Sequence, residues 1–409
     1  MKHPFKMKWW GWGSENVQFT LHERPGILPY LKKNFSIEEL ASPFNHDIDQ
    51  FNIPESSIPE NLINNFKAIV GDAYCTKSKE DRIVHSYGKS YKDLLRIRTK
   101  KIDQAPDLVV YPKSEAEIKS IFNLCEEHKV ALVPFGGGTS VVSGVEANKG
   151  HHQFVCSLDL ARLKSLLKID PESMTADVQA GIFGPELEEK LQEQGYTLGH
   201  FPQSFEFSTL GGWLATRSSG QNSVLYGGIE KVVCSIKTLA PNGEIETINV
   251  PRMAAGPDFK EMILGSEGRL GIITKATIRI CKLPEQKKYC MYFFPNFKSA
   301  AEACKDIAQS KAKVAMVRVS DELETEGLLA MGKSQGSIIE ESIKKVVKWH
   351  IQNKGIKLDS FCSVLLGIEG DKQHINITEK LLKNIFRKYN CINMGSTPGK
   401  KWLKDRFFL

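Results

Sequence analysis

PFGGGTS, residues 134–140, is the stretch on which the expected fold depends, because it lies directly after a predicted buried strand at residues 131–133. Three consecutive glycines let the backbone adopt positive φ and approach a ligand closely, so that several N–H groups can point into one anion-sized concavity. A diphosphate fits such a nest. The stretch matches neither the Walker A pattern nor the G-x-G-x-x-G fingerprint. By itself, a glycine triplet is equally compatible with a simple tight turn.

Two further regions favour the ligand-binding interpretation. GHFPQSFEFSTLGGW at residues 199–213 is followed by TRSSGQ at 216–221, and GSEGRLGIIT occupies residues 265–274. Glycine and small hydroxyl residues at this density supply neutral hydrogen bonds and close backbone access, which a large polar cofactor needs and a packed core does not. We therefore expect these loops and residues 134–140 to converge on one dinucleotide.

Short strands alternate with helices from residue 107 onward, which predicts an α+β domain that begins with a β-α-β unit. Pro185 opens and Gly195 closes one of the predicted helices, in keeping with the usual asymmetry of helix ends. The predicted elements are strand 108–111, helix 116–128, strand 131–133, helix 185–195, a hairpin of strands 232–239 and 244–248, and strand 272–280.

The regions on either side of this domain differ from it. The first 70 residues are predicted to be irregular and to wrap a larger body, because five prolines interrupt any periodic pattern. A second domain is predicted after Pro284, with strand 289–294, helix 299–309, strand 314–319, helix 338–351, strand 363–368 and helix 375–388. The predicted boundaries are 1–105 for the wrapping segment and start of the first domain, 106–283 for that domain, and 284–409 for a partial cap.

The segment KWWGWG, residues 8–13, places three indoles in a glycine-punctuated turn. We expect it to form an apolar plug docked on another domain. The alternative is an interfacial membrane anchor, with Lys2, Lys6 and Lys8 meeting lipid headgroups.

Composition excludes several classes of protein. The chain has 409 residues, of which 41% are hydrophobic and 25% charged, as in ordinary globular domains. No apolar run reaches the length of a membrane span and the start lacks a secretory signal, which predicts a cytoplasmic protein. The net charge of +7 is spread without a dense basic arm, so no nucleic-acid partner is expected. Nine scattered cysteines without a C-x-x-C pair predict reduced packing residues and no metal site.

The order of the three motif regions carries a family resemblance. P-x-G-G-G-T-S, then S-x-E-F-S-T-x-G-G-W-x-x-T-R-x-S-G, then G-S-E-G-x-L-G-I-I-T is similar to the FAD domain of the vanillyl-alcohol-oxidase superfamily, and within it to the alkyldihydroxyacetonephosphate synthase family. The resemblance covers residues 106–320 and extends to the tryptophan segment and residues 251–258. It implies an α+β fold, with a two-lobed PCMH-type FAD-binding domain followed by an incomplete α+β cap.

The resemblance also implies a cofactor and its contacts. Residues 134–140 would hold the pyrophosphate of FAD, and three further segments would line the rest of it. Covalent attachment in this superfamily commonly uses a histidine in the first loop, and residues 134–146 contain none, so noncovalent FAD is implied. The implied contacts are Pro134, Phe135, Gly136, Gly137, Gly138, Thr139, Ser140, Gln203, Ser204, Phe205, Glu206, Phe207, Ser208, Thr209, Thr216, Arg217, Ser218, Ser219, Glu267, Gly268, Arg269, Leu270, Gly271, Ile272 and Ile273. His200 is either a satisfied structural histidine or a polar contact beside the flavin.

The implied activity is an exchange reaction of ether-lipid synthesis, in which the acyl chain of acyl-dihydroxyacetone phosphate is replaced by a fatty alcohol. The partners implied are a lipid-like phosphate substrate and a fatty alcohol, with a homodimer and a peripheral membrane contact left open. Arg318 lies on a predicted strand, on the face opposite Val317 and Val319. The resemblance places it where an active-site arginine could bind the substrate phosphate, whereas a cap arginine of no special role would be solvated or salt-bridged.

One departure from the family pattern concerns the catalytic groups. The tyrosine and histidine cluster of the family have no counterpart in these 409 residues, and the adjacent His151 and His152 lie in a polar turn of the first domain. We therefore expect a half-built cap with exposed sheet edge, completed by a second chain or by dimerisation. Two alternatives remain: an FAD-linked dehydrogenase or oxidase of 2-hydroxy acids, and a noncatalytic FAD-binding remnant.

Overall fold

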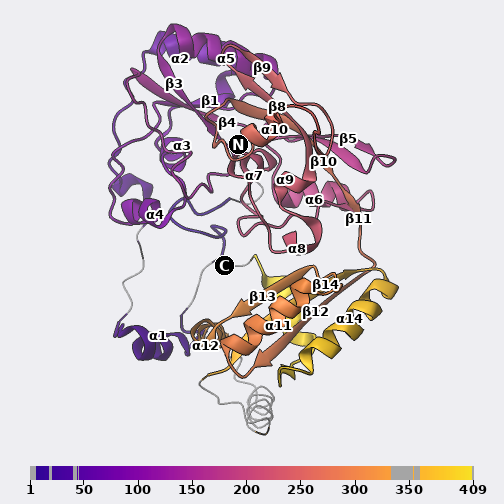
Figure 1. Cartoon of the computed structure of the whole chain (residues 1–409). Coiled ribbons are helices and arrows are strands. Elements are labelled where there is room, and N and C mark those ends of the chain that lie inside the picture. Colours follow the sequence, from indigo (N-terminus) through magenta and orange to yellow (C-terminus); the bar gives the residue numbers. More distant parts are fainter. Residues whose placement is uncertain are drawn as a thin grey trace. The chain divides into compact units, whose positions relative to one another are not determined.

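The computed structural model describes residues 6–17, 21–39, 44, 46–332, 353 and 360–407 (Figure 1). The chain divides into two compact units. The first comprises residues 1–15 and 44–283, and the second comprises residues 16–43 and 284–408. The chain therefore leaves the first unit after residue 15, returns to it at residue 44, and leaves it again after Leu283.

The first lobe of the first unit is a four-stranded sheet in the order β1-β2-β4-β3. Strands β2, β4 and β3 are parallel, and β1 runs antiparallel to β2. The crossover helix α5 joins β2 to β3, as the predicted β-α-β unit requires. The elements are α2 (Glu60–Val70), β1 (Cys75–Thr76), α3 (Lys79–Val84), α4 (Tyr91–Arg98), β2 (Leu108–Val110), α5 (Glu115–Glu127), β3 (Val130–Phe135) and β4 (Phe154–Asp159).

The second lobe is an antiparallel five-stranded sheet in the order β5-β6-β10-β8-β9, with a separate ribbon of β7 and β11. The predicted hairpin is confirmed, since β8 and β9 are joined by Pro241 and Asn242. The elements are β5 (Leu166–Asp170), β6 (Thr175–Gln179), α6 (Gly184–Gln192), β7 (Tyr196–Thr197), α7 (Leu210–Thr216), α8 (Ser223–Tyr226), α9 (Ile229–Val232), β8 (Val233–Ala240), β9 (Gly243–Glu246), α10 (Phe259–Ile263), β10 (Ile272–Arg279) and β11 (Cys281–Lys282).

Local chemistry explains why α5 forms where it does. The Ser114 side chain accepts a hydrogen bond from the Glu117 backbone N–H and caps the first turn. Ile118, Ile121, Phe122 and Cys125 then recur at helical spacing and are buried. They join a core that includes Leu239 of β8 and Ile272 of β10, so the two lobes share one hydrophobic core.

The predicted irregularity of the first 70 residues is wrong, because helices α1 (Ile27–Phe35) and α2 occupy 20 of them. Pro29 falls in the first turn of α1, where a missing N–H breaks no hydrogen bond, and Pro59 is the N-cap of α2. Pro29 and Pro59 therefore mark helix starts. Helix α1 belongs to the second unit, where the Tyr30 hydroxyl donates to the Leu323 carbonyl oxygen at 3.0 Å.

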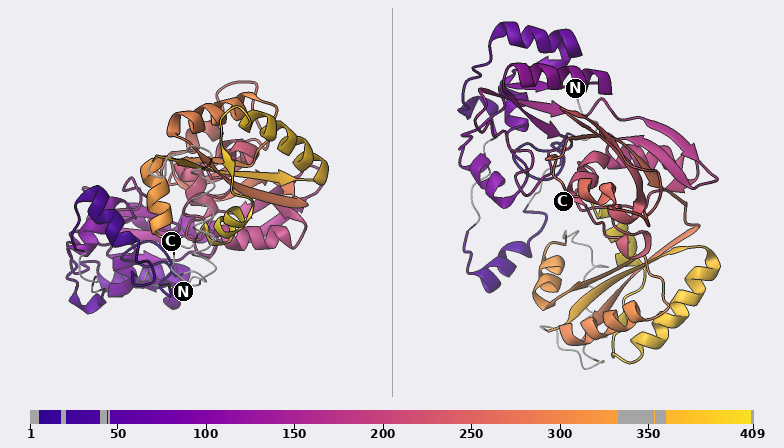
Figure 2. Two further views of the ribbon diagram at one scale, coloured as in Figure 1. Left: turned by 90° about the horizontal axis from the view of Figure 1, so that it is seen from below. Right: turned by 45° about the horizontal axis from the view of Figure 1, so that its top comes forward.

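The second unit contains a β-α-β-β-α-β arrangement, with the strand order β13-β14-β12-β15 of a ferredoxin-like sheet. Helices α11 and α14 cover one face of this sheet, and α15 packs against Tyr289 and Leu365 on the other (Figure 2). The elements are β12 (Gln286–Phe294), α11 (Phe297–Gln309), β13 (Met316–Ser320), α12 (Glu322–Ala330), β14 (Cys362–Gly370), α14 (Lys372–Phe386), β15 (Ile392–Asn393) and α15 (Thr397–Asp405). The predicted helix at 338–351 lies outside the described residues.

The cap core explains this arrangement. Ala300, Ala303 and Ile307 recur on one face of α11, and they pack with the buried faces of β14 and α14. Small alanines let α11 lie close to the sheet. Strand β15 pairs with β12 through only two residues, and among the described residues β13 pairs with β14 alone. Of the two edge strands, β15 is therefore short, with two residues, whereas β13 has five.

Two predictions about side chains and spans can be compared with the structure. All nine cysteines are free, and six of them are buried, as expected of packing residues. Among the described helices, none combines the length and the apolarity that crossing a bilayer requires.

Two phenylalanines three positions apart test the cap core. Phe294 is fully buried, whereas the Phe297 side chain is 48% exposed. We expect Phe294→Ala to lower the free energy of unfolding of the cap by about 3–5 kcal/mol, because the lost side chain leaves a cavity. Phe297→Ala is the matched control and should change it by less than about 0.5 kcal/mol. Urea denaturation followed by circular dichroism measures both; equal losses would contradict the assigned core.

Candidate FAD site

The glycine triplet lies where β3 ends and touches the backbone of another loop. A Cβ atom at position 137 would lie 1.7 Å from the Phe207 carbonyl oxygen, and one at position 136 would lie 2.5 Å from the Thr209 hydroxyl. Gly138 has φ of +67° and faces the Phe135 ring. Only glycine permits this approach at position 137, because a backbone oxygen cannot move aside as a flexible side chain can. The triplet is thus more than a tight turn.

The second loop is fixed by the start of α7. The Thr209 side chain accepts a hydrogen bond from the Gly212 backbone N–H and caps the helix. Ser208 donates to the Ser204 carbonyl oxygen at 2.8 Å and accepts from the Trp213 indole N–H at 2.7 Å. Trp213 is 2% exposed, so the end of this loop that leads into α7 is anchored to the core.

A third segment, residues 264–271, joins the first two. The Gly265 and Glu267 backbone N–H groups donate to the Leu214 and Ala215 carbonyl oxygens at 3.1 and 2.9 Å. A Cβ at position 268 would lie 2.9 Å from the Pro134 ring, and one at position 144 would lie 2.7 Å from the Glu267 carboxylate. The structure therefore brings together all four segments that contain the predicted FAD contacts: 134–140, 203–209, 216–219 and 267–273.

Two non-glycine residues in these segments, and one shortly after the first segment, hold a left-handed backbone. Ser143, Arg217 and Glu267 have φ of 64°, 52° and 52°. Such conformations cost on the order of 1 kcal/mol each and persist where the surroundings over-determine them. Arg217 ends α7 and forms an ion pair with Glu261, so its backbone and its side chain are both fixed. The loops are shaped before a ligand arrives.

His200 is fully buried beneath this site. Its Nε2 lies 2.8 Å from the Ser218 hydroxyl, and its Nδ1 has no hydrogen-bond partner among the described residues. Burial lowers the pKa of His200 to about 4, so the ring is neutral near pH 7. Burial also raises the pKa of the Glu206 and Glu267 carboxyls. Two features fit a large polar cofactor: the buried His200 Nδ1 lacks a hydrogen-bond partner among the described residues, and the glycine loop leaves space that a single Cβ at position 137 would fill.

Two supporting residues were missed by sequence reasoning. His85 Nε2 lies 3.1 Å from a carboxylate oxygen of Asp159, and both side chains are at most 3% exposed. His85 Nδ1 lies 2.7 Å from the Asp81 carbonyl oxygen, and the His85 ring lies against the Phe135 ring at 4.1 Å between centroids. The pair therefore supports the residue from which the glycine loop begins. No local pattern connects positions 85 and 159.

Lys89 links the glycine loop to the tryptophan segment. Its backbone N–H donates to the Ser140 carbonyl oxygen, and its ammonium donates to the Trp9 carbonyl oxygen, both at 2.7 Å. Trp9 is 5% exposed and packs edge-on against Phe51, so this segment is an apolar plug that packs within the first unit, to which it belongs, and not on another domain. Burial lowers the pKa of Lys89 to about 8. The Ser90–Asp93 capping box, an S-x-x-D pattern, was the one sequence signal near this residue.

Arg318 lies in the second unit, on β13, as predicted. Its guanidinium donates to the Glu324 carboxylate at 2.5 Å, and both side chains are about two-fifths exposed. In the structure Arg318 is therefore salt-bridged, as expected of a cap arginine without a special role. A role for Arg318 in binding substrate stays a prediction.

Comparison with known proteins places the chain in a class. Residues 106–249 match the family model described as an FAD binding domain, and residues 283–398 match that of the C-terminal domain of FAD-linked oxidases. The chain is an FAD-binding protein of this two-domain type, with the α+β fold predicted, and FAD is its cofactor.

Individual relatives show a more specific similarity to this chain. The alkyldihydroxyacetonephosphate synthase of Dictyostelium discoideum is 35% identical over 99% of this chain and 70% of its own length. A solved structure of an alkyldihydroxyacetonephosphate synthase covers 98% of this chain and 76% of its own, with 34% identity and a TM-score of 0.88. The mitochondrial D-lactate dehydrogenase (cytochrome) of Arabidopsis thaliana is 34% identical over 68% of this chain and 47% of its own length. The chain belongs to the alkyldihydroxyacetonephosphate synthase family.

Substitutions at two glycines of the site test whether FAD binding depends on the close approach of the loops. Gly137→Ala places a Cβ against the Phe207 carbonyl oxygen, whereas a Cβ at position 212 would make only an ordinary contact, at 3.4 Å, with Thr209. We expect Gly137→Ala to weaken FAD binding by at least about 30-fold, since the loops must separate at a cost of about 2 kcal/mol. Gly212→Ala, inside α7, should bind FAD as the parent does. Flavin absorbance per purified chain measures both, and normal flavin content in Gly137→Ala would contradict the close approach.

The buried neutral His200 predicts a pH dependence of stability. Its pKa of about 4 lies below the ordinary value of 6.5, so the folded state rejects a proton that the unfolded chain accepts. The stabilising contribution is complete above about pH 6.5 and is lost as the pH falls toward about 4, for a total of roughly 3 kcal/mol. We expect His200→Gln, which can keep the bond to Ser218, to flatten the acid side of the stability curve, measured by urea unfolding. The exposed-site control His152→Gln should leave that curve unchanged; an unaltered slope in His200→Gln would rule out this assignment.

Proposed function

We propose that this chain exchanges the acyl group of acyl-dihydroxyacetone phosphate for a fatty alcohol, with FAD as its cofactor. The carrying observation is the similarity to alkyldihydroxyacetonephosphate synthases over nearly the whole chain, including the cap. The proteins compared share both the cofactor domain and the domain that follows it. A likeness confined to the cofactor domain would support FAD binding alone.

The residues of the first unit have the roles of binding and orienting the cofactor. The backbone N–H groups of residues 134–140 would bind the pyrophosphate, and residues 203–209, 216–219 and 267–273 would line the remainder. Bound FAD supplies the reactive flavin ring at which the exchange takes place. Lys89 and the His85–Asp159 pair hold the glycine loop in place, and His200 orients Ser218. With no histidine in residues 134–146, we propose that FAD is held without a covalent bond.

Arg318 is our candidate for binding the phosphate of the substrate. Its ion pair with Glu324 is half exposed, and such pairs contribute about 0–1 kcal/mol. A doubly charged phosphate can accept two parallel hydrogen bonds from one guanidinium and can therefore displace a single carboxylate. Glu324 then keeps the guanidinium oriented while substrate is absent.

Location and assembly are further parts of this proposal. A cytoplasmic protein in peripheral contact with a membrane would meet both lipid-like substrates where they concentrate. A homodimer is supported by the edge strand β13, whose five residues pair with β14 alone among the described residues, since an unpaired strand edge can recruit a further strand. Sedimentation velocity on the FAD-loaded chain, with and without vesicles, tests both.

The alternative is an FAD-linked dehydrogenase of 2-hydroxy acids, which the similarity to D-lactate dehydrogenase over 68% of the chain keeps in view. That reaction reduces FAD outright. Anaerobic addition of lactate or glycolate would bleach the flavin of a dehydrogenase and leave that of an exchange enzyme yellow. A noncatalytic FAD-binding remnant would show neither bleaching nor exchange.

The exchange activity and the role of Arg318 can be measured together. We expect FAD-loaded protein to incorporate labelled hexadecanol into acyl-dihydroxyacetone phosphate. Arg318→Ala should lower kcat/KM by roughly 10- to 100-fold, the value of a charge-assisted bond to phosphate. Glu324→Gln, which removes the competing carboxylate, should leave kcat/KM equal or higher. Absence of exchange in fully loaded protein overturns the proposed function, whereas full activity of Arg318→Ala overturns only the assignment of this residue.

A further inference from the structure

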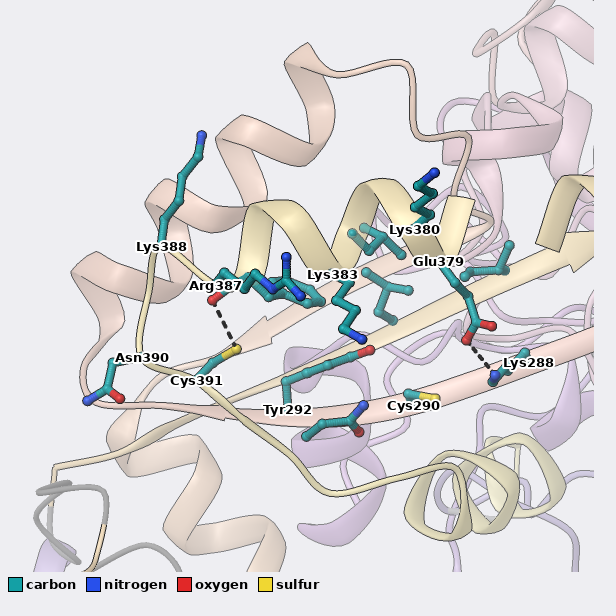
Figure 3. Close-up of a pocket in the computed structure, with 15 residues that line it drawn as sticks. Lys288, Cys290, Tyr292, Glu379, Lys380, Lys383, Arg387, Lys388, Asn390 and Cys391 are labelled. Carbon is teal, nitrogen blue, oxygen red and sulfur yellow. Dashed lines mark hydrogen bonds and ion pairs between the residues drawn. The ribbon is translucent and has the colours of Figure 1, made fainter. Parts of the chain in front are cut away.

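A groove of about 930 Å³ runs along the C-terminal half of α14, beside strand β12 (Figure 3). We call it the α14 groove. Its floor comes from alternate residues of β12, its wall from α14, and its end from the segment that leads into β15. All of these elements belong to the second unit, and none of the residues is a predicted FAD contact. Its size is in the range of ligand-binding pockets.

Positive charge is concentrated here. Among the 15 residues that line the α14 groove, five are lysine or arginine and one is acidic, whereas the whole chain has 55 basic against 48 acidic residues. The acidic residue, Glu379, is already paired with Lys288, and Lys388 pairs with Asp306 at 3.2 Å. Lys380, Lys383 and Arg387 have no ion-pair partner among the described residues.

The spacing of these three cations is unfavourable without a counter-ion. Positions 380, 383 and 387 follow one face of a helix, and like charges three or four residues apart repel each other by a few tenths of a kcal/mol. The helix C-terminus attracts cations and accounts for part of the arrangement. It does not account for their position over a groove whose floor is apolar. An anion in the groove would relieve the repulsion.

The accessible apolar surface in the floor of the α14 groove is mainly the half-buried Tyr292 ring, because the other apolar side chains there are almost fully buried. The Tyr292 ring contacts the Phe386 ring at 4.3 Å between centroids, and Leu366, Ile368 and Leu382 lie beneath with at most 2% exposure. Burial raises the pKa of the Tyr292 hydroxyl, so it stays protonated and can donate a hydrogen bond. In Figure 3 the Lys383 side chain extends toward the Tyr292 side chain.

We infer that the α14 groove binds an anion carried on an apolar chain, with the headgroup at Lys383 and Arg387 and the chain along Tyr292 and Phe386. Carboxylate and phosphate headgroups share this chemistry, so a long-chain carboxylate and a lipid phosphate are the two sources. The inference does not rest on the proposed exchange reaction, because the groove is assigned from its own side chains.

Titration calorimetry on the FAD-loaded chain tests this inference. The probes are decanoate and decyl phosphate, each below its micelle concentration, with decanol as the uncharged counterpart and acetate as the chainless one. We expect saturable binding of at least one of the two charged probes, and the tighter of them identifies the source. Decanol and acetate should bind at least about tenfold more weakly, because each lacks one of the two interactions.

Charge variants locate the binding. Lys383→Gln and Arg387→Gln should each lower the affinity for the charged probe by about tenfold, which corresponds to the loss of one charge-assisted hydrogen bond. Lys372→Gln removes an exposed cation from the first turn of the same helix, outside the groove, and should change binding by less than about twofold. Flavin content and exchange activity are measured on all three variants as a check of folding.

Three results would overturn the inference. Charged probes that bind equally well to Lys383→Gln and to the parent would place the site elsewhere. Decanol that binds as tightly as decanoate would reduce the groove to an apolar surface. A third result would assign the groove to an acidic protein instead: neither decanoate nor decyl phosphate binds, whereas a glutamate-rich peptide binds the parent chain and loses that binding in Lys383→Gln.

Discussion

The close approach of the glycine triplet to the backbone of residues 207–209 is the constraint on which the cofactor domain depends. A Cβ at position 137 would be 1.7 Å from a carbonyl oxygen, so this contact is possible between two backbones and impossible with a side chain between them. Glycine loses much conformational freedom on folding, so the approach must be held by other interactions. Residues 264–271 provide them by hydrogen-bonding to the end of α7 while touching the glycine loop.

Buried polar groups supply the remaining support, and they come from distant parts of the chain. His85 and Asp159 form a pair under Phe135, and the Lys89 ammonium donates to the Trp9 carbonyl oxygen. Burying such groups is unfavourable unless each finds a partner, so partners must be placed accurately. This requirement makes the tryptophan segment part of the cofactor domain, although more than a hundred residues separate it from the glycine loop.

The cap uses the two faces of one helix for different purposes. Ile375 and Ile385 of α14 enter the core, Leu382 and Phe386 belong both to the core and to the floor of the groove, and Lys380, Lys383 and the C-cap Arg387 line the groove beside β12. The hydrophobic period of the sequence predicted the helix itself. It could not predict the groove, because that prediction requires knowing which strand lies next to the charged side chains. The same reasoning applies to Arg318, whose position on β13 was predictable and whose partner Glu324 was not.

The sequence alone predicted the opening β-α-β unit, the β8–β9 hairpin, the loops that converge and the family resemblance, because glycine placement and hydrophobic period are local properties of the chain. It missed strands β4, β5 and β6 of the cofactor domain. It misjudged the first 70 residues, where prolines that begin helices α1 and α2 were taken for interruptions. Only the tertiary structure decided that His85 meets Asp159, that Lys89 holds both Trp9 and Ser140, and that residues 16–43 join the second unit. These contacts join residues tens of positions or more apart, and no local pattern encodes which buried donor will reach which acceptor once the core has closed.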